Sequence, residues 1–179
     1  EAAELVFDGA MAEPHVSINE QQAGYWAYGY NAFRVDATPF LKSGKLNIGV
    51  HLQNLEESSR WYPGGGLYRP VKLVLTQRAH LDDWATFIRT EKADSSVAVV
   101  AVDAAIKGFE GQEGYATEVT VTDAKGKLIG AVHHNIDEKG ATSGSIEVRK
   151  PRLWSPETPY LYTATTRLYR YGKLIDEAQ

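Results

Sequence analysis

Apolar and polar residues alternate with a period of two along most of this chain, and this alternation constrains the fold strongly. A strand places successive side chains on opposite faces, so the alternation is typical of half-buried strands. No window longer than about eight residues carries the 3.6-residue apolar stripe of a helix. We therefore predict an all-β chain, with alternating strands at residues 46–52, 71–75, 115–121, 146–148 and 160–171.

Two further patterns support this prediction. Residues 96–106 are almost entirely Val and Ala, and their β-branched content favours a strand buried on both faces over a helix. Asp123-Ala124-Lys125-Gly126 predicts a hairpin turn into a strand at 128–133, and Gly172-Lys173 predicts another turn.

The character of the chain changes between residues 78 and 92. Before this point, loops rich in glycine and aromatic residues join the strands, and afterwards the turns are short and regular. The second part has the length and strand spacing of an immunoglobulin-like sandwich, without the cysteine pair of antibody domains. We expect two domains, at residues 1–78 and 79–179. The first has few strands for a closed sandwich.

Charge and composition exclude several classes of protein. Nineteen basic residues against 23 acidic ones give a net charge of -4, which argues against a nucleic-acid-binding protein. No stretch approaches the ~20 apolar residues of a membrane helix, and no cysteine is available for disulfides or thiolate chemistry. The first residues lack a basic and apolar leader, so we expect no signal peptide. Ten Tyr and four Trp suit sugar faces, but composition alone favours the ordinary tyrosine surplus of a β protein.

Three stretches carry the most distinctive residues: 16–41, 58–75 and 152–169. Together they resemble the non-catalytic half of glycoside hydrolase family 2, the family of β-galactosidases, β-glucuronidases and β-mannosidases. The matching residues are Phe7, Gly9, Asn19, Gly24, Gly29, Tyr30, Phe33, Asp36 and Thr38, then Arg60 to Tyr62 and Gly66 to Arg69, then Leu153 to Pro156, Pro159, Leu161 and Tyr162. Glu20 and Tyr28 depart from the pattern, since glycine is usual at both places.

The resemblance implies a partial jelly-roll sandwich, similar to galactose-binding domains, followed by an immunoglobulin-like β-sandwich. It also implies that the catalytic glutamates lie on a (β/α)8 barrel that would begin near residue 175, so no catalytic residue is expected in this chain. The first jelly-roll strands are expected to be missing. We expect a fragment, inactive alone, of a retaining β-glycosidase from the bacterial cytoplasm or periplasm. β-Galactosidase is the first choice, with β-glucuronidase and β-mannosidase open.

Arg60, Trp61 and Tyr62 are the candidate site residues, because the resemblance implies that their loop reaches the rim of the sugar pocket. A guanidinium can donate two parallel hydrogen bonds, and an indole can stack on a sugar face. In the alternative, Trp61 and Tyr68 fill a domain interface and Arg60 forms a structural ion pair. The expected partners are a carbohydrate substrate, the missing barrel and, optionally, a second copy of the chain. No nucleic acid, membrane, cofactor or metal is expected.

Other conspicuous residues are expected to be structural. Asn19-Glu20 predicts a turn, although an Asn-Glu pair carries the acid/base in the family's barrel. His133 and His134 should point to opposite faces of a strand, where they cannot chelate one metal. Asp82-Asp83 and Glu56-Glu57 are expected to be exposed pairs without the converging oxygens of a calcium site. Trp154 is expected to be a core residue, packed where the immunoglobulin-like domain meets its neighbour; the alternative is that it binds sugar.

Two alternatives to a hydrolase fragment remain. A free-standing carbohydrate-binding module would also carry Trp and Tyr on a sandwich, but it would bind sugar by itself. A structural interaction module would pair through exposed strand edges and bare apolar faces.

Overall fold

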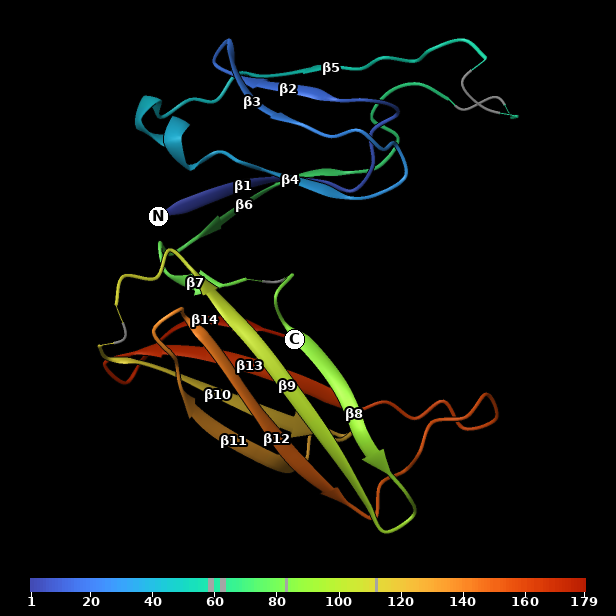
Figure 1. Ribbon diagram of the computed structural model, residues 1–179, viewed down its shortest axis with the longest axis vertical. Coiled ribbons are helices and arrows are strands. Elements are labelled where there is room, and N and C mark those ends of the chain that lie inside the picture. The colour runs from blue at the N-terminus through green and yellow to red at the C-terminus, as the bar shows by residue number, and fades with distance from the viewer. Residues whose placement is uncertain (58–59, 62–63, 83, 112) are drawn as a thin grey trace. The chain divides into compact units, whose positions relative to one another are not determined.

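The computed structural model describes residues 1–57, 60–61, 64–82, 84–111 and 113–179. The chain forms two compact units, Glu1–Thr76 and Gln77–Gln179, each described separately below (Figure 1). In the described residues the only helix is the 3-10 helix η1 (Thr38–Ser43), so the prediction of an all-β chain is confirmed. No described helix is long and apolar enough to cross a membrane.

The N-terminal unit is a sandwich of two antiparallel sheets, with strand orders β4-β1-β6 and β3-β2-β5. The core between them combines apolar side chains from both sheets, among them Phe7, Phe33 and Ile18. Phe7 and Phe33 are direct cross-strand partners whose rings stack at 4.6 Å. The strands are β1 (Ala2–Phe7), β2 (His15–Ile18), β3 (Gln21–Tyr25), β4 (Phe33–Asp36), β5 (Ile48–His51) and β6 (Val71–Thr76).

Strand β6 is present as predicted, but the half-burial expected from its alternation is wrong. Leu73 and Leu75 are 48% and 60% exposed, although they lie directly opposite the buried Leu5 and Ala3 of β1. Strand β6 lies at the edge of its sheet, and none of its side chains belongs to the core cluster of this unit. Alternation alone specifies which side chains share a face and leaves open whether that face is covered.

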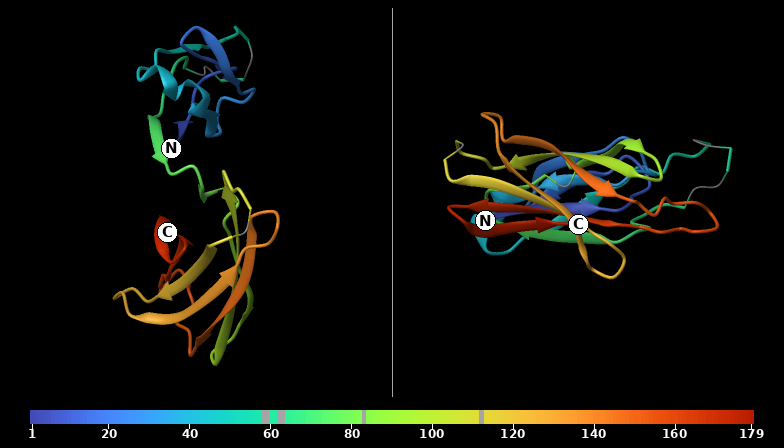
Figure 2. Two further views of the ribbon diagram at one scale, coloured as in Figure 1. Left: turned by 90° about the vertical axis from the view of Figure 1, so that its left-hand side faces the viewer. Right: turned by 90° about the horizontal axis from the view of Figure 1, so that it is seen from below.

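The C-terminal unit is a second sandwich, seen from two further sides in Figure 2. One sheet has the order β12-β9-β7, with β8 also paired to β9, and the other has the order β11-β10-β13-β14. The strands are β7 (His80–Leu81), β8 (Phe87–Ala93), β9 (Val97–Lys107), β10 (Tyr115–Thr122), β11 (Leu128–Asn135), β12 (Ala141–Arg149), β13 (Thr163–Arg170) and β14 (Lys173–Ala178).

Several strand predictions for this unit are confirmed. The Val- and Ala-rich segment forms β9, which is paired along both edges and in which every residue is buried or half-buried. The turn after Asp123 closes the β10–β11 hairpin, with the Gly126 N–H donating to the Asp123 carbonyl. The strand predicted from residue 160 begins only at Thr163, because residues 160–162 lie in the loop before β13.

An aspartate organises each of three turns in this unit. The carboxylate of Asp123 accepts the backbone N–H groups two and four residues later, as does that of Asp137, and these bonds lower both pKa values. Hydrogen bonds to the carboxylate also lower the pKa of Asp94. The bond from the Ser96 hydroxyl has the largest effect, and the bond from the Val97 N–H has the next largest. These depressed pKa values mean that the turns are stabilised by ionised carboxylates, and that this stabilisation is lost as the pH falls through the lowered values.

Candidate functional site

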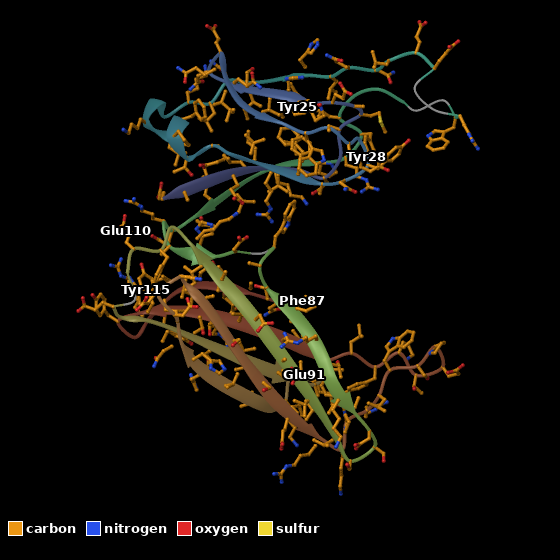
Figure 3. The ribbon with its side chains drawn as sticks, in the orientation of Figure 1. Tyr25, Tyr28, Phe87, Glu91, Glu110 and Tyr115 are labelled. Carbon is orange, nitrogen blue, oxygen red and sulfur yellow. The ribbon has the colours of Figure 1, made fainter. Side chains whose placement is uncertain are left out.

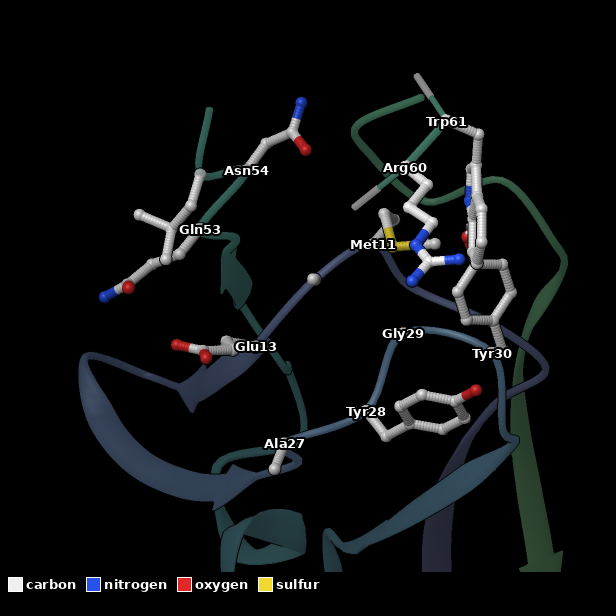
Figure 4. Close-up of a pocket in the computed structure, with 12 residues that line it drawn as sticks. Met11, Glu13, Ala27, Tyr28, Gly29, Tyr30, Gln53, Asn54, Arg60 and Trp61 are labelled. Carbon is white, nitrogen blue, oxygen red and sulfur yellow. Dashed lines mark hydrogen bonds between the residues drawn. The ribbon is translucent and has the colours of Figure 1, made fainter. Parts of the chain in front are cut away.

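A cavity of about 480 Å³ opens in the N-terminal unit, where three loops meet. It is lined by residues 11–13, 27–30, 53–55 and 60–61 (Figure 4). The loops leave the same end of the sandwich, since residues 27–30 follow β3 and residues 53–55 follow β5. The two sheets therefore hold a loop-built hollow, which is the usual way for a rigid scaffold to present a binding site.

One wall of the cavity consists of three amphipathic rings. The Trp61 Nε1–H donates to the Tyr30 hydroxyl at 2.7 Å, and the rings of Tyr28 and Tyr30 lie 5.5 Å apart at a tilt of 55°. Trp61 is 60% exposed and Tyr28 is 55% exposed, so the faces of these rings are open to solvent. Such rings can pack against C–H surfaces while their polar atoms remain hydrogen-bonded.

Contacts at three glycines hold the loop that carries Tyr28 and Tyr30 in place. A Cβ at Gly29 would collide with the Met11 sulfur, so a larger residue there would require the flexible Met11 side chain to move. The Gly29 carbonyl accepts a hydrogen bond from the Tyr68 hydroxyl at 2.7 Å, and the Tyr68 ring lies against Gly9. Gly66 and Met11 exchange two backbone hydrogen bonds of 3.0 Å. The loop is thus tied to both its neighbouring segments, which fixes the aromatic wall.

Arg60 supplies the positive charge of the cavity and Glu13 the negative charge. Figure 4 shows the Arg60 guanidinium on the same side as Trp61 and Tyr30, with Glu13 across the hollow. Among the described residues, no carboxylate lies within ion-pair distance of Arg60. The guanidinium donors can therefore serve a ligand, and paired donors suit vicinal hydroxyls or a carboxylate.

The structure brings two of the three candidate site residues together. Arg60 and Trp61 line the cavity, and Tyr62 lies outside the described residues. Sequence reasoning did not single out Tyr28 and Tyr30 as site residues. The available signals were the surplus of tyrosine and the presence of Tyr28 where glycine is usual. Neither signal could show that these rings converge on Trp61, because that contact spans about thirty positions of sequence.

The pair Asn19-Glu20 forms the turn between β2 and β3, as predicted. Both residues have positive φ, at 51° and 68°, as the type I′ two-residue hairpin turn requires. The Asn19 side chain accepts the backbone N–H of Asn47 at 2.9 Å, so the asparagine ties the turn to the segment before β5.

The histidines and acidic pairs are mostly placed as predicted. His133 is exposed, with its Nε2 3.5 Å from a Glu118 oxygen, while His134 is half-buried on the other face against Gly144. Glu56 and Glu57 are exposed. Asp82 is half-buried instead; its carboxylate accepts the Trp84 N–H and lies 3.5 Å from the Lys107 Nζ, while Asp83 lies outside the described residues. Within the described ranges, no group of three or more His, Asp or Glu side chains could hold a metal.

Trp154 is not buried in the core of its own unit, and its packing against a neighbouring domain stays a prediction. Trp154 is 59% exposed in the loop between β12 and β13, where it lines a second cavity of about 480 Å³ with Leu153, Leu161 and Tyr162. This cavity reaches between the two sheets beside β8.

The chain is similar to known glycosidases over almost its whole length. It is 41% identical to a protein of Formosa agariphila named "Putative beta-glucuronidase", and the match covers 96% of this chain and 16% of that protein. It is 31% identical to β-galactosidase BoGH2A of Bacteroides ovatus, covering 96% of this chain and 21% of the enzyme. The chain thus spans about a fifth of the length of these relatives.

A solved structure and a family profile also match this chain. A glycosyl hydrolase family 2 member from Bacteroides cellulosilyticus superposes with a TM-score of 0.90 at 31% identity, over 99% of this chain and 25% of that structure. The sequence profile of glycosyl hydrolases family 2 matches residues 79–179, which is more than half of the chain. The jelly-roll and immunoglobulin-like sandwiches are therefore those of this family's β-sandwich domains. The chain belongs to glycosyl hydrolases family 2.

Proposed function

We propose that this chain is a non-catalytic N-terminal region of a larger enzyme that hydrolyses terminal β-glycosidic bonds with retention. Family membership and the named activities of the relatives support the glycosidase class. In this proposal residues 1–78 are the jelly-roll domain and residues 79–179 the immunoglobulin-like domain. A following (β/α)8 barrel supplies two carboxyl groups about 5 Å apart, as a retaining mechanism requires.

The role proposed for the aromatic cavity is to wall the sugar pocket of that enzyme. The observation that carries this role is the convergence of Arg60 and Trp61 with two tyrosines on one open hollow. Tyr62 belongs to the same proposal by its place in sequence. Exposed edges, such as β6 with Leu73 and Leu75, are proposed to pack against the barrel or a second copy of the chain.

β-Galactosides are the proposed substrates, because several relatives are named as β-galactosidases. β-Glucuronides are the second candidate, since the 41%-identical relative is named for that activity. A β-glucuronide would offer its carboxylate to the Arg60 guanidinium, whereas a β-galactoside would offer paired hydroxyls.

A substrate panel with the full-length protein tests this proposal. We expect hydrolysis of 4-nitrophenyl β-galactoside, and proton NMR of the first product is expected to show the β-anomer, as retention requires. Preferred hydrolysis of the β-glucuronide would replace the substrate but keep the enzyme class. First release of the α-anomer, or no activity on any β-glycoside, would contradict the proposal.

A further inference from the structure

Two histidines face each other on the outer surface of the three-stranded sheet β3-β2-β5. His15 in β2 and His51 in β5 are direct partners in the antiparallel register. The next pair, Val16 and Val50, packs into the core, so both histidines of the preceding pair point outward. Directly opposite residues have Cβ atoms about 4.5–5.5 Å apart. The two imidazoles can therefore approach one ion from neighbouring strands.

A hollow of about 450 Å³ lies beside the pair, and its lining includes both histidines. Ser17 and Gly49, the next outward-facing pair along the same two strands, form its floor. A Cβ at position 49 would lie 2.6 Å from the Ser17 hydroxyl oxygen, so glycine keeps the hollow open. An ion held by the imidazoles would thus have room for its water ligands.

Three further side chains lie at the histidine pair or line the hollow beside it. The His15 ring packs against Tyr25 of β3, with centroids 4.6 Å apart, so this imidazole has to turn toward β5 to share an ion with His51; Figure 3 labels Tyr25. Glu20 and Gln22 also line the hollow, and they bring a carboxylate and an amide oxygen to its rim. The negative charge of Glu20 favours a cation there.

We infer that His15 and His51 form a two-histidine binding site for a divalent transition metal such as Zn²⁺, Ni²⁺ or Cu²⁺. Imidazole nitrogen is a preferred ligand of these ions, whereas Mg²⁺ and Ca²⁺ prefer oxygen. The described residues contain no cluster of three or more ligating side chains, so water completes the coordination. The site is separate from the proposed sugar cavity, whose lining shares no residue with this hollow.

The contrast with the other histidine pair shows why register matters. His133 and His134 are sequence neighbours on β11, so their rings lie on opposite faces of the sheet. His15 and His51 are far apart in sequence but share one face and one register position. Of these two pairs, only His15 and His51 can therefore bind one metal ion together.

Calorimetric titration of the 179-residue chain, carrying no histidine tag, with NiCl₂ and ZnCl₂ tests the inference. We expect one site, and either His15→Gln or His51→Gln should weaken its affinity at least about tenfold, because each removes one arm of the chelate. His133→Gln, at an exposed histidine of the other unit, is the matched control and should leave the affinity unchanged. Circular dichroism checks that each variant is folded.

Copper electron paramagnetic resonance provides a measurement that needs no variant. The unmodified chain with one equivalent of Cu²⁺ should show hyperfine coupling to two imidazole nitrogens. Coupling to a single nitrogen would overturn the inference. It would also be overturned if both variants bound metal like the unmodified chain, or if only one substitution mattered, because binding would then need one imidazole.

Discussion

Replacing Phe7 with alanine is expected to lower the free energy of unfolding of the N-terminal unit by about 3–5 kcal/mol. The Phe7 side chain is fully buried, and its ring stacks on Phe33 at the centre of the sandwich. Removing the ring loses apolar burial and leaves a cavity where strands β1 and β4 meet. Urea denaturation followed by tryptophan fluorescence measures the effect, because Trp26 lies 6.0 Å from Phe33 between ring centroids.

Leu75→Ala is the matched control for this substitution. Leu75 lies in the same sheet, on the strand next to Phe7, but it is 60% exposed. Its removal should change the free energy of unfolding by no more than about 0.5 kcal/mol, as is usual for surface positions. Equal effects of the two substitutions would contradict the core described here.

Arg60→Ala in the full-length enzyme is expected to reduce kcat/KM on its β-glycoside substrate by about 10- to 100-fold. A hydrogen bond to a charged group contributes about 1.5–3 kcal/mol, and each 1.4 kcal/mol corresponds to a factor of ten. Arg60→Lys should recover only part of this loss, since an ammonium group keeps the charge without the planar pair of donors. Steady-state kinetics with separate kcat and KM values measure the effect.

The control for this prediction is Arg149→Ala, which removes an exposed arginine of β12 in the other unit. Neither substitution is expected to shift the midpoint of thermal unfolding, because both side chains lie on the surface. A kcat/KM for Arg60→Ala within about twofold of the unmodified enzyme would remove Arg60 from the substrate pocket. It would favour the alternative in which the loop is structural.

Strand positions could be predicted from local pattern because a period of two is set by backbone geometry alone. The segments that became β9, β10 and β11 needed no tertiary information. Burial could not be predicted in the same way. Leu73 and Trp154 are apolar and exposed, because their burial depends on what covers an edge strand or a loop.

Only part of the candidate site could be predicted from the sequence, because some of its contacts depend on tertiary structure. Arg60 and Trp61 are neighbours in sequence and came from one motif, so a single loop places both. Tyr30 joins them only through a hydrogen bond between distant loops. The pairing of His15 with His51 likewise depends on strand register, which sequence alternation leaves undetermined.

We propose that this chain supports a glycosidase without binding or cleaving sugar by itself. The most direct test is calorimetric titration of the isolated 179-residue chain with methyl β-galactoside and methyl β-glucuronide, with released sugar measured in the same samples. Negligible heat of binding and no free sugar are expected. Micromolar affinity would identify a free-standing carbohydrate-binding module, and sugar release would place catalytic groups within this chain; either result would overturn the proposed supporting role.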